Sequence, residues 1–158
     1  MPEGLSLMSR AFSHQSDIPT KFTCEGENIN PQLIIDRVPK AANSLALIMY
    51  DPDAAKEPGG FGATFIHWVL FNIPSDVTTI PEGSAPAHAV EGKNSAGANK
   101  YTGPCPPTFK HRYFFKLYAL DTALDLPEGT TKEQVESAMK GHITEQTELV
   151  GLYEKQKK

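Results

Sequence analysis

The stretch SLALIMYD, residues Ser44–Asp51, is an apolar run that ends on an acid, and it predicts a buried β-strand. Two other stretches share this character, Phe65–Ile73 (FIHWVLFNI) and Arg112–Leu120 (RYFFKLYAL), since both are rich in branched and aromatic residues. Weaker strand signals cover Leu5–Met8 and Gln32–Ile35. The connections between the main strands are too short for crossover helices, so we expect an antiparallel β core.

Helical signals are confined to the C-terminal end of the chain. Thr130 and Glu133 match a capping box. Apolar residues follow at helical spacing, namely Val135, Ala138, Met139 and Ile143. We expect a second helix behind them, carrying Leu149, Leu152 and Tyr153. This order of elements predicts one mainly β domain over residues 1–158, with short C-terminal helices.

Composition and charge exclude several classes of protein. The 158 residues carry a formal net charge of −4, which gives no support to nucleic-acid binding because phosphate backbones attract basic surfaces. No apolar stretch approaches the ~20 residues of a membrane-spanning helix. The start MPEGLSLMSR lacks the pattern of a secretory signal, so we expect a cytoplasmic protein.

The two cysteines, Cys24 and Cys105, fit no metal-binding spacing. In a reducing compartment the default interpretation is two free thiols. A single long-range disulfide remains an alternative, because some thermophiles keep such bonds inside cells.

Polar residues fall at matching ends of the three main strands. Because side chains alternate faces, Asp51 ends the stripe of Leu45, Leu47 and Met49. His67 shares a face with Phe65, Val69 and Phe71, which leaves Trp68 on the opposite face as a packing residue, and His111 shares a face with Tyr113. If the strands are antiparallel neighbours, one sheet edge gathers Asp51, Asp53, His67, His111 and Tyr113. Taken singly, the Asp-Pro-Asp stretch is typical of a turn, and a lone strand histidine is typical of a structural residue.

Four ordered motifs give the chain a recognisable signature. They are TCEGENINP (Thr23–Pro31), DPDA (Asp51–Ala54), HWVLFNIP (His67–Pro74) and YTGPCPP (Tyr101–Pro107) leading into HRYFF (His111–Phe115). In order, spacing and length the chain resembles the phosphatidylethanolamine-binding protein (PEBP) family, in its prokaryotic Raf kinase inhibitor-like branch. The resemblance runs from Leu5 to Tyr153.

The resemblance implies a β-sandwich of antiparallel, Greek-key sheets with peripheral helices and a pocket for small anions such as phosphate or phosphorylethanolamine. By the same resemblance the ligand-binding residues are Asp51, Asp53, Phe65, His67, Gly103, Cys105, Pro106, Pro107, His111 and Tyr113, with Gly103 and Cys105 offering backbone at the wall. It implies no catalytic residue, cofactor or metal. Arg112 is expected to be structural and to pair with Asp53.

The chain departs from the family pattern twice. Ala55 stands where the family usually has proline after the second Asp of DPDA. Thr108-Phe109-Lys110 replaces a stretch that usually contains glycine, so we expect Phe109 to cover part of the pocket mouth and Lys110 to add a positive charge at the rim.

The main hypothesis is a non-catalytic anion-binding protein that regulates a kinase or a protease. An imidazolium donates charge-assisted hydrogen bonds to phosphate oxygens, a nearby Asp favours that protonated form, and loop amides near Gly103 add donors. One alternative is a serine protease inhibitor that acts through the proline-stiffened loop Asn94–Lys110. A second alternative is a metal-dependent hydrolase, since two Asp and two His could hold a divalent ion. The expected partners are a small anion and a kinase or serine protease, without integral membrane contact, and the chain is expected to be a monomer or a homodimer.

Overall fold

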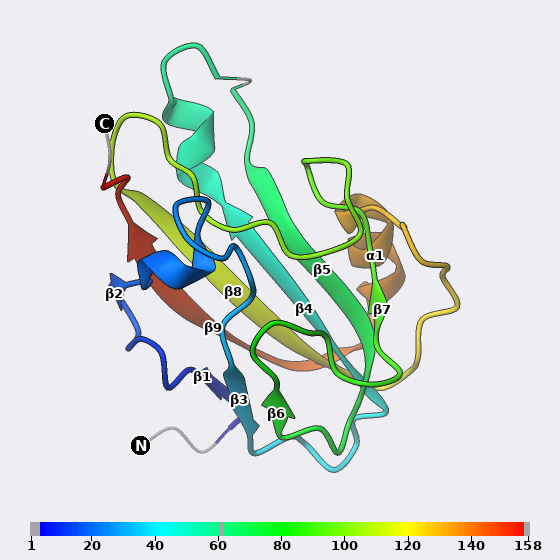
Figure 1. Ribbon diagram of the computed structural model, residues 1–158. Helices are drawn as coiled ribbons and strands as arrows, with labels where there is room; N and C mark the ends of the chain where they lie inside the picture. The colour runs from blue at the N-terminus through cyan, green and yellow to red at the C-terminus, as the bar shows by residue number, and fades with distance from the viewer. Residues whose placement is uncertain (1–3, 61, 157–158) are drawn as a thin grey trace.

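Two β-sheets packed face to face make up most of the computed structural model, which describes residues 4–60 and 62–156 (Figure 1). The larger sheet has six strands in the order β2-β9-β8-β4-β5-β7, and only the β2–β9 pair is parallel. Its strands are β2 (Ser16–Asp17), β4 (Ser44–Asp51), β5 (Phe65–Pro74), β7 (Val90–Glu91), β8 (His111–Leu120) and β9 (Ile143–Tyr153). The smaller sheet joins β1 (Ser6–Met8), β3 (Leu33–Asp36) and β6 (Thr79–Ile80) in the order β1-β3-β6.

The three main predicted strands are confirmed and lie side by side. β4 is central, with β5 on one side and β8 on the other, both antiparallel to it. The weaker strand predictions also hold, as β1 and β3. This arrangement brings the end of β4 beside the starts of β5 and β8, because antiparallel neighbours run in opposite directions.

Two apolar cores lie on opposite faces of the larger sheet. The larger core fills the space between the sheets, and Leu47 of β4 and Phe115 of β8 meet Leu33 of β3 there. The smaller core lies under helix α1 (Lys132–Met139), whose Val135 and Met139 belong to the same apolar cluster as Ile48 of β4. Because side chains alternate along β4, successive residues of this strand contribute to the two cores in turn.

Helix α1 begins one residue later than the sequence predicted. Thr131 is the N-cap, and its hydroxyl accepts from the amide of Gln134 at 3.3 Å while the Gln134 side chain accepts from the Thr131 amide at 3.1 Å. The hydroxyl of Thr130 donates to the carbonyl of Pro127 at 2.6 Å instead. The capping box is therefore real, but it uses the next pair of residues.

The predicted second C-terminal helix is wrong, because its residues form strand β9, paired with β8 along its length. Leu149 and Tyr153 enter the larger core with Gly151 between them on the same face. A Cβ at Gly151 would lie 2.5 Å from Cγ1 of Ile18, so only glycine fits there. Because Gly151 has no side chain, the apolar alternation of the strand is interrupted there. The remaining apolar residues, Leu149, Leu152 and Tyr153, have a spacing that also fits a helix.

Strand β5 contains an extra residue that changes the direction of His67. Met49 pairs with Trp68 while Tyr50 pairs with Ile66, so His67 is left over between them as a β-bulge. Trp68 lies in the larger core, and the ring of His67 contacts Tyr113 of that same core at 5.3 Å between centroids. The prediction that Trp68 lies opposite His67 is wrong, and the bulge is the reason.

Two short 3-10 helices lie near the site that is described below. These are η1 (Thr20–Phe22) and η2 (Pro52–Lys56), and η2 follows β4 directly. Figure 1 shows η2 (teal) and the yellow-green loop before β8 at the same end of the larger sheet. Within the described residues, no helix has the length and apolar character needed to cross a bilayer.

Candidate functional site

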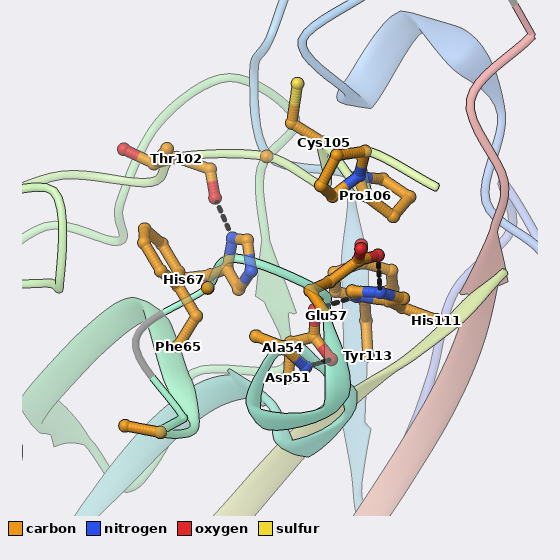
Figure 2. Close-up of a pocket in the computed structure, with 14 residues that line it drawn as sticks. Asp51, Ala54, Glu57, Phe65, His67, Thr102, Cys105, Pro106, His111 and Tyr113 are labelled. Atoms are coloured by element: carbon orange, nitrogen blue, oxygen red, sulfur yellow. Dashed lines mark hydrogen bonds and ion pairs between the residues drawn. The ribbon is translucent and has the colours of Figure 1, made fainter. Parts of the chain in front are cut away.

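A cavity of about 230 Å³ lies where β4 ends and β5 and β8 begin (Figure 2). Its walls come from these three strands, from η2 and the segment after it, and from the loop before β8. Its lining residues are Asp51, Ala54, Glu57, Gly60, Ala63, Phe65, His67, Thr102, Gly103, Cys105, Pro106, Pro107, His111 and Tyr113. Every predicted site residue except Asp53 is among them.

Asp51 connects the end of β4 to the cavity. One carboxylate oxygen caps η2 by accepting from the amides of Asp53 at 2.8 Å and Ala54 at 3.1 Å. The other oxygen lies 2.6 Å from Nδ1 of His111. Burial raises the pKa of Asp51, although hydrogen bonds from His111 and from the two amides act in the opposite direction. The Asp-Pro-Asp turn reading and the pocket reading are therefore both true of this residue.

His111 is held between two carboxylates. Its Nδ1 lies 2.6 Å from Asp51 Oδ2 and its Nε2 lies 2.6 Å from Glu57 Oε2, with all three side chains buried. Ionised carboxylates only accept hydrogen bonds, so both ring nitrogens donate and the ring is a cation when both acids are ionised. The Asp51–His111–Glu57 cluster then carries a net charge of −1. Neither nitrogen remains free to donate to a ligand, which corrects the expected role of this histidine.

Glu57 is the charged lining residue that sequence reasoning missed, beside the uncharged Ala54, Gly60, Ala63 and Thr102. It lies in the segment KEPGG, whose composition is that of an exposed loop, so no local signal marks it. Its Oε1 accepts from the hydroxyl of Thr108 at 2.6 Å. Burial acts to raise the pKa of Glu57, but hydrogen bonds from Thr108 and His111 outweigh it and lower that pKa. Thr108 is the first residue of the stretch after Pro107 that departs from the family pattern, so this departure supplies a hydrogen-bond donor to Glu57.

His67 lines the cavity, and one of its ring nitrogens has no partner among the described residues. Its Nδ1 lies 2.6 Å from the carbonyl oxygen of Thr102, and because a carbonyl only accepts, Nδ1 carries the proton. Its Nε2 is buried and has no hydrogen-bond partner among the described residues. Burial lowers the pKa of His67 to about 4, and the neighbouring charge of His111 acts in the same direction. The ring is therefore neutral near pH 7, and Nε2 is an acceptor.

Tyr113 supplies the second open polar atom. Its side chain is fully buried, and its hydroxyl finds no partner within the part of the chain that the structure describes. Burial raises the pKa of Tyr113 well above its usual range, so the hydroxyl keeps its proton. The ring of Tyr113 meets the edge of the His67 ring at an interplanar angle of 77°.

Asp53 does not reach the cavity. Its carboxylate accepts from the amide of Arg112 at 2.9 Å and from the Arg112 guanidinium at 2.9 and 2.8 Å. The hydrogen bonds from Arg112 lower the pKa of Asp53 to about 2. The expected Asp53–Arg112 pair is confirmed. Because Arg112 binds the Asp53 carboxylate, that carboxylate does not line the cavity as expected.

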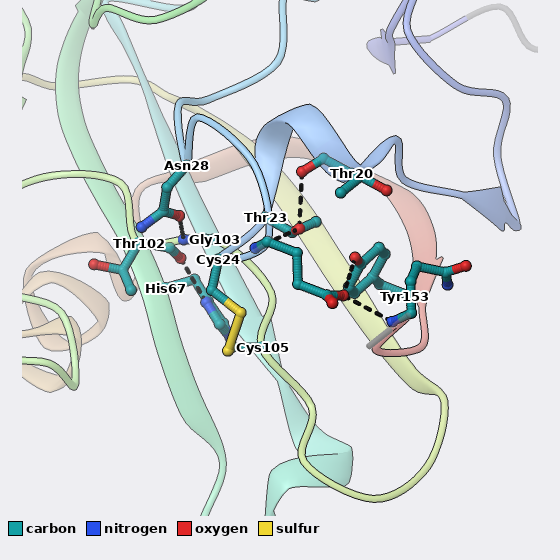
Figure 3. Close-up of a disulfide and its surroundings, with 11 residues drawn as sticks. Thr20, Thr23, Cys24, Asn28, His67, Thr102, Gly103, Cys105 and Tyr153 are labelled. Carbon is teal, nitrogen blue, oxygen red and sulfur yellow. Dashed lines mark hydrogen bonds between the residues drawn. A yellow bond between two sulfur atoms is a disulfide. The ribbon is translucent and has the colours of Figure 1, made fainter. Parts of the chain in front are cut away.

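A disulfide between Cys24 and Cys105 fixes the loop wall of the cavity, so the open alternative of a long-range bond is the one that the structure contains (Figure 3). Beside it, the amide of Gly103 donates to the side chain of Asn28 at 2.7 Å and the hydroxyl of Tyr101 donates to the carbonyl of Phe22 at 2.8 Å. The Gly103 amide is therefore taken, contrary to the expectation that it would serve a ligand.

The disulfide bears on location as well as on the site. Such bonds are rare in the cytosol outside hyperthermophiles. The predicted cytoplasmic location stays a prediction.

Phe109 and Lys110 are not among the residues that line the cavity. The Phe109 ring packs on the His111 ring with centroids 4.5 Å apart but does not line the cavity. The Lys110 ammonium pairs with Asp17 at 3.1 Å. Tertiary contacts that the sequence does not display hold both side chains, and their expected roles at the mouth and the rim stay predictions.

The chain matches the family model for phosphatidylethanolamine-binding protein over residues 8–154. The chain belongs to this family. A relative from Methanothermobacter thermautotrophicus is 48% identical over 154 residues, which cover 94% of this chain and 98% of the relative. A protein of Pyrococcus abyssi is 45% identical over 162 residues, covering 97% of this chain and 87% of that protein.

Two solved structures extend the likeness to the whole fold. A putative PEBP homologue from Chlamydia trachomatis has a TM-score of 0.92 at 44% identity, covering 98% of this chain and 99% of the homologue. YbcL of E. coli, described as a member of the mammalian PEBP family, has a TM-score of 0.85 at 29% identity, covering 96% and 98%. The predicted family and mainly β fold are thus confirmed.

Proposed function

We propose that this protein is a non-catalytic binding protein for small oxyanion head groups, with phosphate as the simplest ligand. The observation that carries the proposal is a pair of buried, unpartnered polar atoms, His67 Nε2 and Tyr113 Oη, on two residues that line one pre-formed cavity. Buried polar groups in native proteins are nearly always paired, and unpaired ones are costly. Because both residues line one cavity, we infer that a ligand there completes these hydrogen bonds.

The remaining lining supports a head-group site. Pro106, Pro107 and Phe65 give apolar walls against which a short carbon substituent can pack. The cavity of about 230 Å³ suits a phosphoryl group with a small substituent. Affinity for inorganic phosphate itself is expected to be weak, because few ligand atoms offset the lost freedom of motion.

The alternatives gain no support from the geometry. Within residues 4–60 and 62–156, no three His, Cys, Asp or Glu side chains are arranged to hold a metal ion, so the metal-dependent hydrolase lacks a donor set there. A regulatory role toward a kinase or a serine protease stays a prediction.

The test is an NMR titration of ¹⁵N-labelled protein with inorganic phosphate at pH 6. We expect saturable amide shifts clustered at Asp51, His67 and Tyr113. His67→Ala should abolish them, whereas His142→Ala, which changes an exposed histidine paired with Asp121, should leave them intact. Shifts that persist unchanged in His67→Ala would refute the proposed site.

A further inference from the structure

The loop wall of the cavity contains a stretch with few attachments of its own. Cys105, Pro106 and Pro107 all line the cavity. A proline has no backbone N–H to donate, and within the described residues no hydrogen bond holds any of these three. Apart from packing, the covalent bond from Cys105 to Cys24 is what joins the stretch to a distant part of the chain.

The two flanks of this stretch do have hydrogen bonds. On one side, the carbonyl of Pro104 accepts from the amide of Cys24 at 3.1 Å. On the other side, the hydroxyl of Thr108 donates to Glu57 at 2.6 Å. The disulfide holds the part between these flanks against the segment that carries Cys24 (Figure 3). Breaking the covalent bond would therefore free the wall between Pro104 and Thr108.

The disulfide lies at the surface. Both Cys24 and Cys105 are exposed, which is unusual because cysteine is among the most buried residue types. Neither belongs to one of the two apolar cores. Exchange begins when a thiolate attacks a disulfide sulfur, so exposed bonds are the labile ones. We therefore expect a reductant to reach this bond without opening either core.

We infer that the Cys24–Cys105 bond is a site of reversible thiol–disulfide exchange, and that its reduction opens the cavity wall and weakens the oxyanion site. The reactant is a dithiol. One of its thiolates attacks a cysteine sulfur, which breaks the protein's S–S bond and forms a mixed disulfide. The second thiolate attacks that mixed disulfide and releases the cysteine. The protein gains two electrons and two protons as two thiols, and the dithiol becomes a disulfide.

The loss of affinity follows from the cost of ordering the wall, and this part of the inference rests on the proposed function. In the oxidised protein, residues 105–107 are held in place before a ligand arrives. In the reduced protein a ligand must order them as it binds, and this cost lowers the binding free energy. The proline rings limit the cost because they fix φ. We therefore expect affinity to fall about tenfold rather than vanish.

Wild-type protein treated with dithiothreitol, without denaturant, tests the inference. Rapid alkylation and mass spectrometry should show both cysteines reduced while the amides of β4 keep their protection from hydrogen exchange. Exchange of the Cys24 amide should accelerate, because its acceptor on Pro104 lies beside the freed stretch. Titration with inorganic phosphate, followed by NMR, should give a dissociation constant about tenfold higher than in the oxidised protein. Reoxidation should restore the original value.

Cys24→Ser combined with Cys105→Ser is the matched control. This variant lacks the exchange site, so it should bind phosphate as the reduced wild type does, with and without dithiothreitol. A change of its affinity on addition of dithiothreitol would assign the effect to another group and overturn the inference.

The other outcomes separate the inference from the function on which it partly rests. Reduction that occurs only with global unfolding, or an unchanged phosphate affinity in fully reduced, folded protein, would overturn the inference and leave an oxyanion site. Failure of the oxidised protein to bind phosphate would overturn the proposed function. In that case, faster exchange of the Cys24 amide in reduced, folded protein would support the opening of the wall, and unchanged exchange would overturn it.

Discussion

The two ends of the six-stranded sheet both carry polar side chains among apolar ones, but they treat them differently. At the end where β4 begins, the hydroxyl of Ser44 donates to the carbonyl of Thr122 at 2.6 Å. Nearby, the Asn72 amide donates to the Leu124 carbonyl and accepts from the Leu124 amide, both at 2.7 Å. At the end where β4 finishes, His67 Nε2 and Tyr113 Oη have no partner among the described residues.

This difference teaches which buried polar groups indicate a site. Paired groups such as Asn72 anchor a loop to a strand and stabilise the fold. Unpaired groups cost stability, so they persist only where something other than folding retains them. The candidate site is therefore identified by two buried polar atoms that have no hydrogen-bond partner among the described residues.

The largest expected effect on stability comes from removing the Cys24–Cys105 disulfide, which lies at the cavity end of the sheet. Replacing both Cys24 and Cys105 with serine should lower the free energy of unfolding by about 4 kcal/mol, because the bond joins residues 81 apart in sequence. Urea denaturation measures the loss. Hydrogen exchange should show the loop from 101 to 107 opening while the amides around Asn72 keep their protection. Equal loss of protection at both ends would show that the bond does not act locally.

Acid should act through His67. Burial lowers the pKa of this side chain from its ordinary value of 6.5 to about 4 in the folded protein, so the unfolded state binds more protons between these two values. Stability should therefore fall as the pH is lowered from 6.5 to 4, by about 3 kcal/mol in total. Urea denaturation in phosphate-free buffers measures the slope. His67→Gln should flatten it and His142→Gln should not; an unchanged slope in His67→Gln would contradict the assignment.

At the opposite end, Asn72→Ala should lower the free energy of unfolding by about 2 kcal/mol, because two hydrogen bonds to Leu124 are lost. The positive φ of 54° at this residue adds to the cost, since alanine tolerates it less well than asparagine. Phosphate titration should be unchanged. A weakened phosphate response would mean that the two ends are coupled.

The smallest effect on stability is expected for Tyr113→Phe, which removes an unpaired hydroxyl. The free energy of unfolding should stay the same or rise by about 1 kcal/mol. Binding of inorganic phosphate should weaken at least about tenfold, because the hydroxyl donor is gone. A loss of stability without a loss of binding would assign the hydroxyl to the fold.

The sequence displayed the framework of both ends because strand direction follows from local pattern. Apolar runs located β4, β5 and β8, and their antiparallel order followed from the short connections. His67 and Trp68 were misassigned because a bulge depends on the register of the neighbouring strand, which no single segment contains. Strand β9 was misread because Gly151 has no side chain to show the alternation.

The chemistry of the site was less predictable than its place. The residue types near the cavity were visible, but their partners come from distant segments. Asp53 pairs with Arg112, and Lys110 pairs with Asp17. His111 pairs with Glu57 as well as with Asp51. Which polar atoms remain open for a ligand is therefore a property of the folded chain.

The disulfide also divides the chain topologically. It closes a covalent ring from residue 24 to residue 105, which contains Asp51, Glu57 and His67, while His111 and Tyr113 lie outside it. A single cut of the backbone inside that ring, for instance in the segment 94–104, would leave one covalently joined molecule. Both sets of cavity residues would stay tethered, and the fragments would separate only on reduction.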